Sequence, residues 1–169
     1  PLAFSYLFDL IPNTSPNNSA DAVNASLNAN GDWIFSTSFT TPVDSDSWWF
    51  HVKTVDEFRG LSSSSVHLGP FWIDTIAPVI SASYEDPNQY GWYNHDVTVN
   101  FNATDERSGF LPGGSLTTIL PSGKTTTEGR GLTLTSGIIR DRAGNEAVPV
   151  RVSLNVDKTA PVIHPGTPQ

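Results

Sequence analysis

The sequence predicts an all-β fold of two antiparallel β-sandwiches arranged in tandem. Apolar residues alternate with polar ones over short runs, which is the period of a half-buried strand. The 13 Gly and 13 Pro residues interrupt every apolar run before it reaches helical length. The segment Asp74–Ile80 also recurs as Asp157–Ile163, about one sandwich module further along the chain.

The clearest strand pattern is at 97–104, where Val97, Val99 and Phe101 alternate with polar residues. The segments 48–53 and 150–156 alternate in the same way, and Trp48 is expected to face the core. Weaker patterns predict six more strands, at residues 4–8, 33–39, 66–73, 79–84, 116–120 and 132–139.

The repeat divides the chain into modules at residues 1–76 and 77–159, with 160–169 as a linker or tail. Both copies read Asp-x-x-Ala-Pro, and a Pro at the exit of a module stiffens a short linker. Because the chain begins at Pro1 and contains no Met, we expect it to be a fragment of a longer protein.

The charge balance excludes some functions. With 9 Lys and Arg against 17 Asp and Glu, the formal net charge is −8, which disfavours nucleic-acid partners. No apolar run is long enough to cross a bilayer, so membrane insertion is not expected. There is no Cys, so the sequence contains neither a disulfide framework nor a thiolate metal site.

Five motifs of the second half resemble, in order, a bacterial immunoglobulin-like repeat of large secreted and surface proteins. They are residues 91–99, 105–109, 127–129, 141–145 and 157–161. The first half resembles a fibronectin type III-like repeat through residues 4–9, 48–56 and 67–75. The resemblance implies an extracellular or cell-surface location, with the neighbouring modules of the same chain as partners.

This chain departs from those families in two ways. Ala103 stands where many members of the immunoglobulin-like repeat have a Cys. Members of the fibronectin type III-like family also have two strands ahead of the segment that matches residues 4–9. We therefore expect the first sandwich to lack its N-terminal strands, which upstream sequence would supply by strand addition.

Carboxylates near the ends of the modules are candidate calcium ligands, because Ca²⁺ prefers six to eight oxygen ligands. The candidates are Asp56, Asp74, Asp105, Glu106, Asp141 and Asp157. The alternative is that these side chains cap turns, as Asp commonly does. Calcium is the only cofactor that this pattern suggests, and the sequence shows no requirement for one.

Trp92 and Tyr93 are candidates for stacking against a sugar, with family packing as the alternative. His51, His67, His95 and His164 show no spacing typical of a zinc site. The run 62–65 of serines reads as a flexible loop and not as a nucleophile motif. Asn13, Asn17, Asn24 and Asn102 lie in glycosylation sequons, which chance also produces in so polar a sequence.

The sequence as a whole favours a non-catalytic spacer or stalk in a secreted or cell-surface protein. One alternative is an adhesive or carbohydrate-binding module with surface glycans as partners. Another is a strand-exchanging subunit of a filament or surface layer, with other copies of the chain as partners. We expect no enzymatic activity, because no catalytic motif accompanies the candidate residues.

Overall fold

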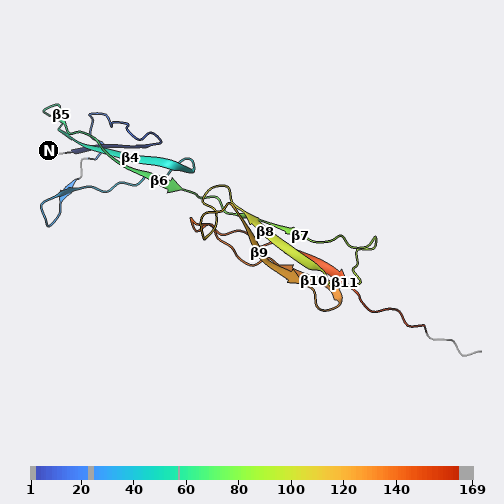
Figure 1. The fold of residues 1–169 in the computed structure, drawn as a ribbon. Coiled ribbons are helices and arrows are strands. Elements are labelled where there is room, and N and C mark those ends of the chain that lie inside the picture. The colour runs from blue at the N-terminus through green and yellow to red at the C-terminus, as the bar shows by residue number, and fades with distance from the viewer. Residues whose placement is uncertain (1–2, 23–24, 57, 164–169) are drawn as a thin grey trace, which may run out of the picture. The chain divides into compact units, whose positions relative to one another are not determined.

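The computed structural model describes residues 3–22, 25–56 and 58–163 (Figure 1). Its internal contacts divide the chain into two compact units, Pro1–Asp74 and Thr75–Gln169, called unit 1 and unit 2 below. Every regular element described is a β-strand, so the prediction of an all-β chain is confirmed. Asn24 and His164 lie outside the described residues. Within the described ranges there is no helix with the length and apolarity to cross a bilayer.

Unit 1 is built on one sheet with a long central strand. Its strands are β1 (Ala3–Asp9), β4 (Ser45–Asp56), β5 (Leu61–Ser62) and β6 (Val66–Ile73), and a small separate hairpin consists of β2 (Ser26–Leu27) and β3 (Trp33–Ile34). The central strand β4 pairs antiparallel with β1, β5 and β6. The β4–β6 ladder contains register shifts between Ser45 and Phe50.

One face of this sheet is aromatic. Phe4 and Phe8 project from β1, and the rings of Phe35 and Phe39 stack on them with centroid separations of 4.5 and 4.7 Å. The expected strand over residues 33–39 is therefore mostly wrong, because only Trp33–Ile34 pairs as a strand. After Ile34 the chain buries aromatic area against the sheet instead of continuing a ladder of backbone hydrogen bonds.

The opposite face of the sheet is buried and polar. His51 is fully buried and Lys53 is 8% exposed, although both alternate with the core residue Trp48. Residues 10–22 cover them, with Lys53 Nζ donating a hydrogen bond to Asn18 Oδ1 at 2.6 Å. The expected burial of Trp48 is confirmed at 5% exposure, but the alternation did not indicate that both faces of β4 are covered.

Unit 2 contains two antiparallel sheets around one apolar core. Its strands are β7 (Val79–Ser83), β8 (Thr98–Thr104), β9 (Thr117–Lys124), β10 (Gly129–Thr135) and β11 (Arg151–Val156). The sheet orders are β7-β8-β9 and β10-β11. Val97, Phe101 and Val156 are fully buried, and both sheets contribute to the same cluster. This arrangement of the two sheets is sandwich-like (Figure 1). The inward positions of β8 and β11 contribute about half of the buried cluster.

Candidate metal centre

Two turns of unit 2 each begin with a buried aspartate. Asp105 follows β8, and its Oδ2 accepts hydrogen bonds from the backbone N–H groups of Arg107 at 3.0 Å and Gly109 at 2.6 Å. Gly109 has φ +69°, and a Cβ there would lie 2.5 Å from the carbonyl oxygen of Gly114. The Asp-x-x-Ser-Gly motif is thus a tight turn that needs both its Asp and its Gly.

The second turn contains Asp141 and closes in a similar way. Asp141 Oδ1 accepts from the N–H groups of Gly144 at 2.7 Å and Asn145 at 2.9 Å, and Oδ2 accepts from Asn145 Nδ2 at 2.7 Å. The N–H of Arg142 donates to the carbonyl of Gly109 at 2.8 Å, which ties the two turns together. Backbone hydrogen bonds therefore hold both carboxylates in place.

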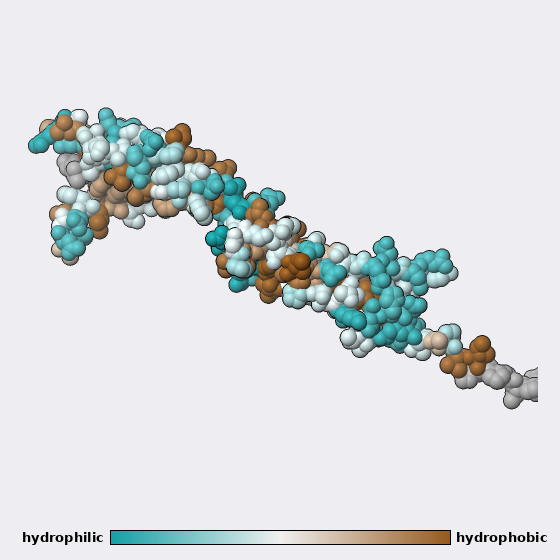
Figure 2. Space-filling view, viewed as in Figure 1, coloured by the Kyte–Doolittle hydropathy of each residue, from teal (hydrophilic) through white to brown (hydrophobic). Residues whose placement is uncertain are grey.

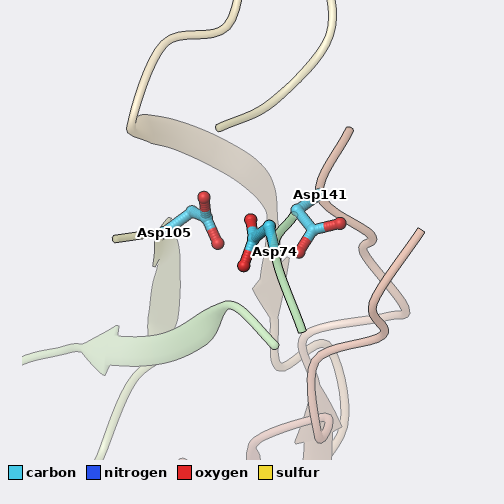
Figure 3. A group of neighbouring side chains, drawn as sticks. All are labelled: Asp74, Asp105 and Asp141. Atoms are coloured by element: carbon cyan, nitrogen blue, oxygen red, sulfur yellow. The ribbon is translucent and has the colours of Figure 1, made fainter. Parts of the chain in front are cut away.

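The third carboxylate belongs to Asp74, which follows β6 and precedes Thr75 at the start of unit 2. One carboxylate oxygen from each of Asp74, Asp105 and Asp141 lies within 4.8 Å of the others. Figure 3 shows the Asp74 carboxylate between those of the other two. Asp105 and Asp141 are each only 6% exposed, so water screens the repulsion between these like charges poorly.

One oxygen of this group has no partner. Asp105 Oδ1 is buried, and no group in the described part of the chain is placed to hydrogen bond to it. Neither Asp105 nor Asp141 forms an ion pair with a described Lys or Arg side chain. A buried, unpartnered carboxylate oxygen beside two further carboxylates is electrostatically unfavourable unless a cation binds there.

The donor set suits a hard cation. Carboxylate oxygens are the ligands that Ca²⁺ prefers, and its flexible geometry allows backbone carbonyls and water to complete six to eight contacts. The Asp105 oxygens and the Asp141 oxygens keep lone pairs beyond the hydrogen bonds described above. The three residues therefore fit calcium without rearrangement of either turn.

The other three calcium candidates do not join this cluster. Asp56 ends β4, accepts from the N–H of Arg59 at 3.2 Å and lies 3.8 Å from its Nε. Asp157 caps a turn by accepting from the N–H of Thr159 at 3.0 Å. Glu106 is exposed although it adjoins Asp105. For Asp56 and Asp157 the turn-capping alternative describes the contacts better.

The two aromatic candidates do not form an exposed platform. Tyr93 is 5% exposed, its hydroxyl donates to the carbonyl of Glu85 at 2.7 Å, and its backbone bridges to β11. Burial, with smaller contributions from Tyr84, Glu85 and Asp86, raises the pKa of Tyr93. Trp92 is half-buried, and the Arg130 guanidinium lies 5.1 Å from its ring centroid. Tyr93 thus has no ring face open to a sugar.

The histidines show no metal-ligand spacing in the sequence, but two of them are in contact in the fold. His51 on β4 and His67 on β6 are directly opposite in the antiparallel register, and their Nδ1 atoms are 2.6 Å apart. The two residues are far apart in sequence, so only the strand register brings them together. The signal available was their position in two adjacent predicted strands, which does not specify the register.

The fold and the site together define an all-β, sandwich-like protein with a buried acidic cluster beside two turns. No protein-family model matches the chain, and neither a curated protein nor a solved structure is significantly similar to it.

Proposed function

We propose that this chain is a calcium-stabilised structural spacer, composed of β-sandwich modules of a secreted or cell-surface protein. The observation that carries the proposal is the grouping of Asp74, Asp105 and Asp141 around the unpartnered Asp105 Oδ1. Calcium binding there offsets the repulsion among the carboxylates and stabilises the folded form of unit 2.

The chain's other properties are consistent with a spacer. Unit 2 has its own apolar core, and a Pro-containing segment joins it to unit 1. We assign unit 2 to an immunoglobulin-like sandwich and unit 1 to an incomplete fibronectin type III-like sandwich. Asp157 follows β11 as Asp74 follows β6, so the repeated motif would provide the same carboxylate to a further module.

Thermal unfolding of the full chain tests the calcium proposal. Extracellular modules bind calcium with dissociation constants of about 10⁻⁴–10⁻³ M, so 10 mM Ca²⁺ stabilises unit 2 by roughly 1.4–2.7 kcal/mol. The unfolding midpoint then rises by about 6–20 °C relative to the same protein in chelator. An equal midpoint in calcium and in chelator rejects the site.

A strand-exchanging subunit is the second candidate, and the surface of unit 1 favours it. The described part of unit 1 contains a single extended sheet, and β6 pairs only with β4. Val66 and Trp72 on β6 are 53% and 72% exposed, and Phe39 over the aromatic face is 45% exposed. Figure 2 shows brown, hydrophobic patches at the surface of unit 1.

An added strand along β6 would use backbone groups that β4 leaves unpaired, and upstream sequence or a second copy would supply it. The Gly69-Pro70 step limits this pairing, because Pro has no backbone N–H. Sedimentation velocity over a range of concentrations tests self-association. A single monomeric species at all concentrations removes the filament candidate and leaves the spacer.

A further inference from the structure

The buried face of unit 1 contains a chain of three polar side chains from three strands. His51 Nε2 on β4 lies 3.0 Å from Asp9 Oδ1 on β1, and His51 Nδ1 lies 2.6 Å from His67 Nδ1 on β6. His51 is fully buried and His67 is half-buried. The two imidazole rings meet edge to face, with centroids 4.9 Å apart and an interplanar angle of 69°.

Asp9 determines which nitrogen of His51 carries the proton. Asp9 Oδ1 also accepts a hydrogen bond from the Ile11 N–H at 2.8 Å, and an Asp side chain is normally ionised at neutral pH. An ionised carboxylate can only accept hydrogen bonds, so His51 Nε2 must be the donor. In the neutral imidazole this leaves the lone pair on Nδ1, directed at His67.

A histidine whose second nitrogen donates to a carboxylate is the usual form of a histidine metal ligand. The carboxylate orients the ring, selects the tautomer and makes the ligating nitrogen more basic. His67 presents its own Nδ1 to the same point from the neighbouring strand. One proton occupies that point in the hydrogen-bonded pair, and a metal ion can replace it.

We propose that His51 and His67, supported by Asp9, form a two-histidine site for a borderline-soft divalent metal ion such as Cu²⁺, Ni²⁺ or Zn²⁺. On binding, each Nδ1 donates a lone pair to the metal. The proton of His67 moves from Nδ1 to Nε2, so the pair loses no proton. Water molecules fill the remaining coordination positions, as in metal sites that keep open positions.

The required movement is small. Metal–nitrogen distances of about 2.0–2.1 Å place two imidazole nitrogens roughly 3.0–3.3 Å apart, compared with 2.6 Å in the hydrogen-bonded pair. His67 is on β6, which pairs only with β4 in the described structure. The register of this β4–β6 ladder shifts nearby, between Trp48 and Phe50. A slight outward rotation of the His67 side chain therefore suffices.

This site is chemically distinct from the acidic cluster of unit 2. Imidazole nitrogen favours Cu²⁺, Ni²⁺ and Zn²⁺, whereas Ca²⁺ and Mg²⁺ favour oxygen. The affinity for divalent ions should follow the order Cu²⁺ above Ni²⁺ and Zn²⁺. Binding at the histidine pair therefore neither requires nor excludes calcium binding at Asp105.

Calorimetric titration of the full chain with NiCl₂, in buffer with saturating calcium to occupy the acidic cluster, tests the proposal. The wild-type chain should bind Ni²⁺, and His67→Gln should weaken binding at least tenfold. Asp9→Asn should weaken it about 10- to 100-fold, which is the usual effect of removing an outer carboxylate. His95→Gln is the matched control, because His95 also contacts a carboxylate, Glu85, at 2.8 Å, but is exposed in unit 2.

A second readout avoids dependence on the stability of the variants. The electron paramagnetic resonance spectrum of the Cu²⁺-loaded wild-type chain should show coupling to two imidazole nitrogens, and that of His67→Gln coupling to one. The absence of Ni²⁺ binding at 1 mM, or equal binding by the wild type and His67→Gln, overturns the proposal. In that case the two histidines form only a hydrogen-bonded pair, and the calcium proposal is unaffected.

Discussion

The substitution Asp105→Asn should stabilise unit 2 in the absence of calcium and should lose that advantage when calcium is present. Asn has the same shape as Asp, and its Oδ1 can still accept the two hydrogen bonds from Arg107 and Gly109. Its Nδ2 takes the place of the unpartnered Oδ1 and can donate to the neighbouring carboxylates of Asp74 or Asp141. The substitution removes one of three clustered negative charges and keeps the turn.

The expected magnitudes follow from the geometry. Two unit charges at the 4.8 Å limit of the cluster repel by roughly 3.5 kcal/mol at an effective dielectric constant of about 20. Turning the charge-assisted hydrogen bonds of the turn into neutral ones costs about 1–2 kcal/mol. In chelator, Asp105→Asn should thus be more stable than the wild type by about 1.5–2.5 kcal/mol, or roughly 6–20 °C in midpoint.

In 10 mM calcium this advantage should be largely cancelled, because the wild type gains roughly 1.4–2.7 kcal/mol from binding and the variant gains little. Differential scanning calorimetry in chelator and in calcium measures both differences. Glu106→Gln is the matched control, since it removes the same charge from the adjacent, exposed position. Its response to calcium should equal that of the wild type. If Asp105→Asn is destabilised by the same amount in both conditions, Asp105 is only a turn cap and the reasoning is refuted.

Three further substitutions test the fold. Phe101→Ala should cost unit 2 about 3–5 kcal/mol, because it leaves a cavity at a fully buried position; a loss below about 1 kcal/mol in chemical denaturation would contradict that core. Gly109→Ala should abolish the calcium response and cost more than about 2 kcal/mol, since its Cβ would meet the carbonyl of Gly114 at a positive φ; an unchanged midpoint in calorimetry would contradict the turn. The lowered pKa of Asp9 means that its contribution to unit 1 is present above 3.8 and is lost as the pH falls through the lower, folded-state pKa. Asp9→Asn should therefore reduce the loss of stability of unit 1 between pH 5 and pH 2, measured by denaturant unfolding; an unchanged pH dependence would contradict this assignment.

Apolar and polar residues alternate in the sequence wherever one side of a strand faces the core and the other faces water. Val97, Val99 and Phe101 are buried and the residues between them are exposed, as predicted. The pattern fails for β4 because both of its faces are covered, one by aromatic rings such as that of Phe39 on Trp48 and the other by residues 10–22. A local pattern contains no information about segments that fold over a strand from elsewhere in the chain.

The acidic residues illustrate the same limit. Composition and spacing identify Asp74, Asp105 and Asp141 as candidates, but they also select Asp56 and Asp157, whose contacts are those of turn caps. All five residues are aspartates near the ends of the modules, so the sequence does not distinguish them. What separates them is whether the folded chain brings carboxylate oxygens together out of contact with water.

The sequence by itself determined the all-β class and the core positions of β8 and β11, and it indicated that Asp105 and Asp141 either cap turns or bind calcium. These depend on neighbours within a few residues, where side-chain alternation and turn chemistry dominate. Only the tertiary structure decided that Asp74 joins those two turns and that His51 faces His67. Both groupings depend on strand register and loop packing between residues distant in sequence, and the free energies that select them come from the fold as a whole.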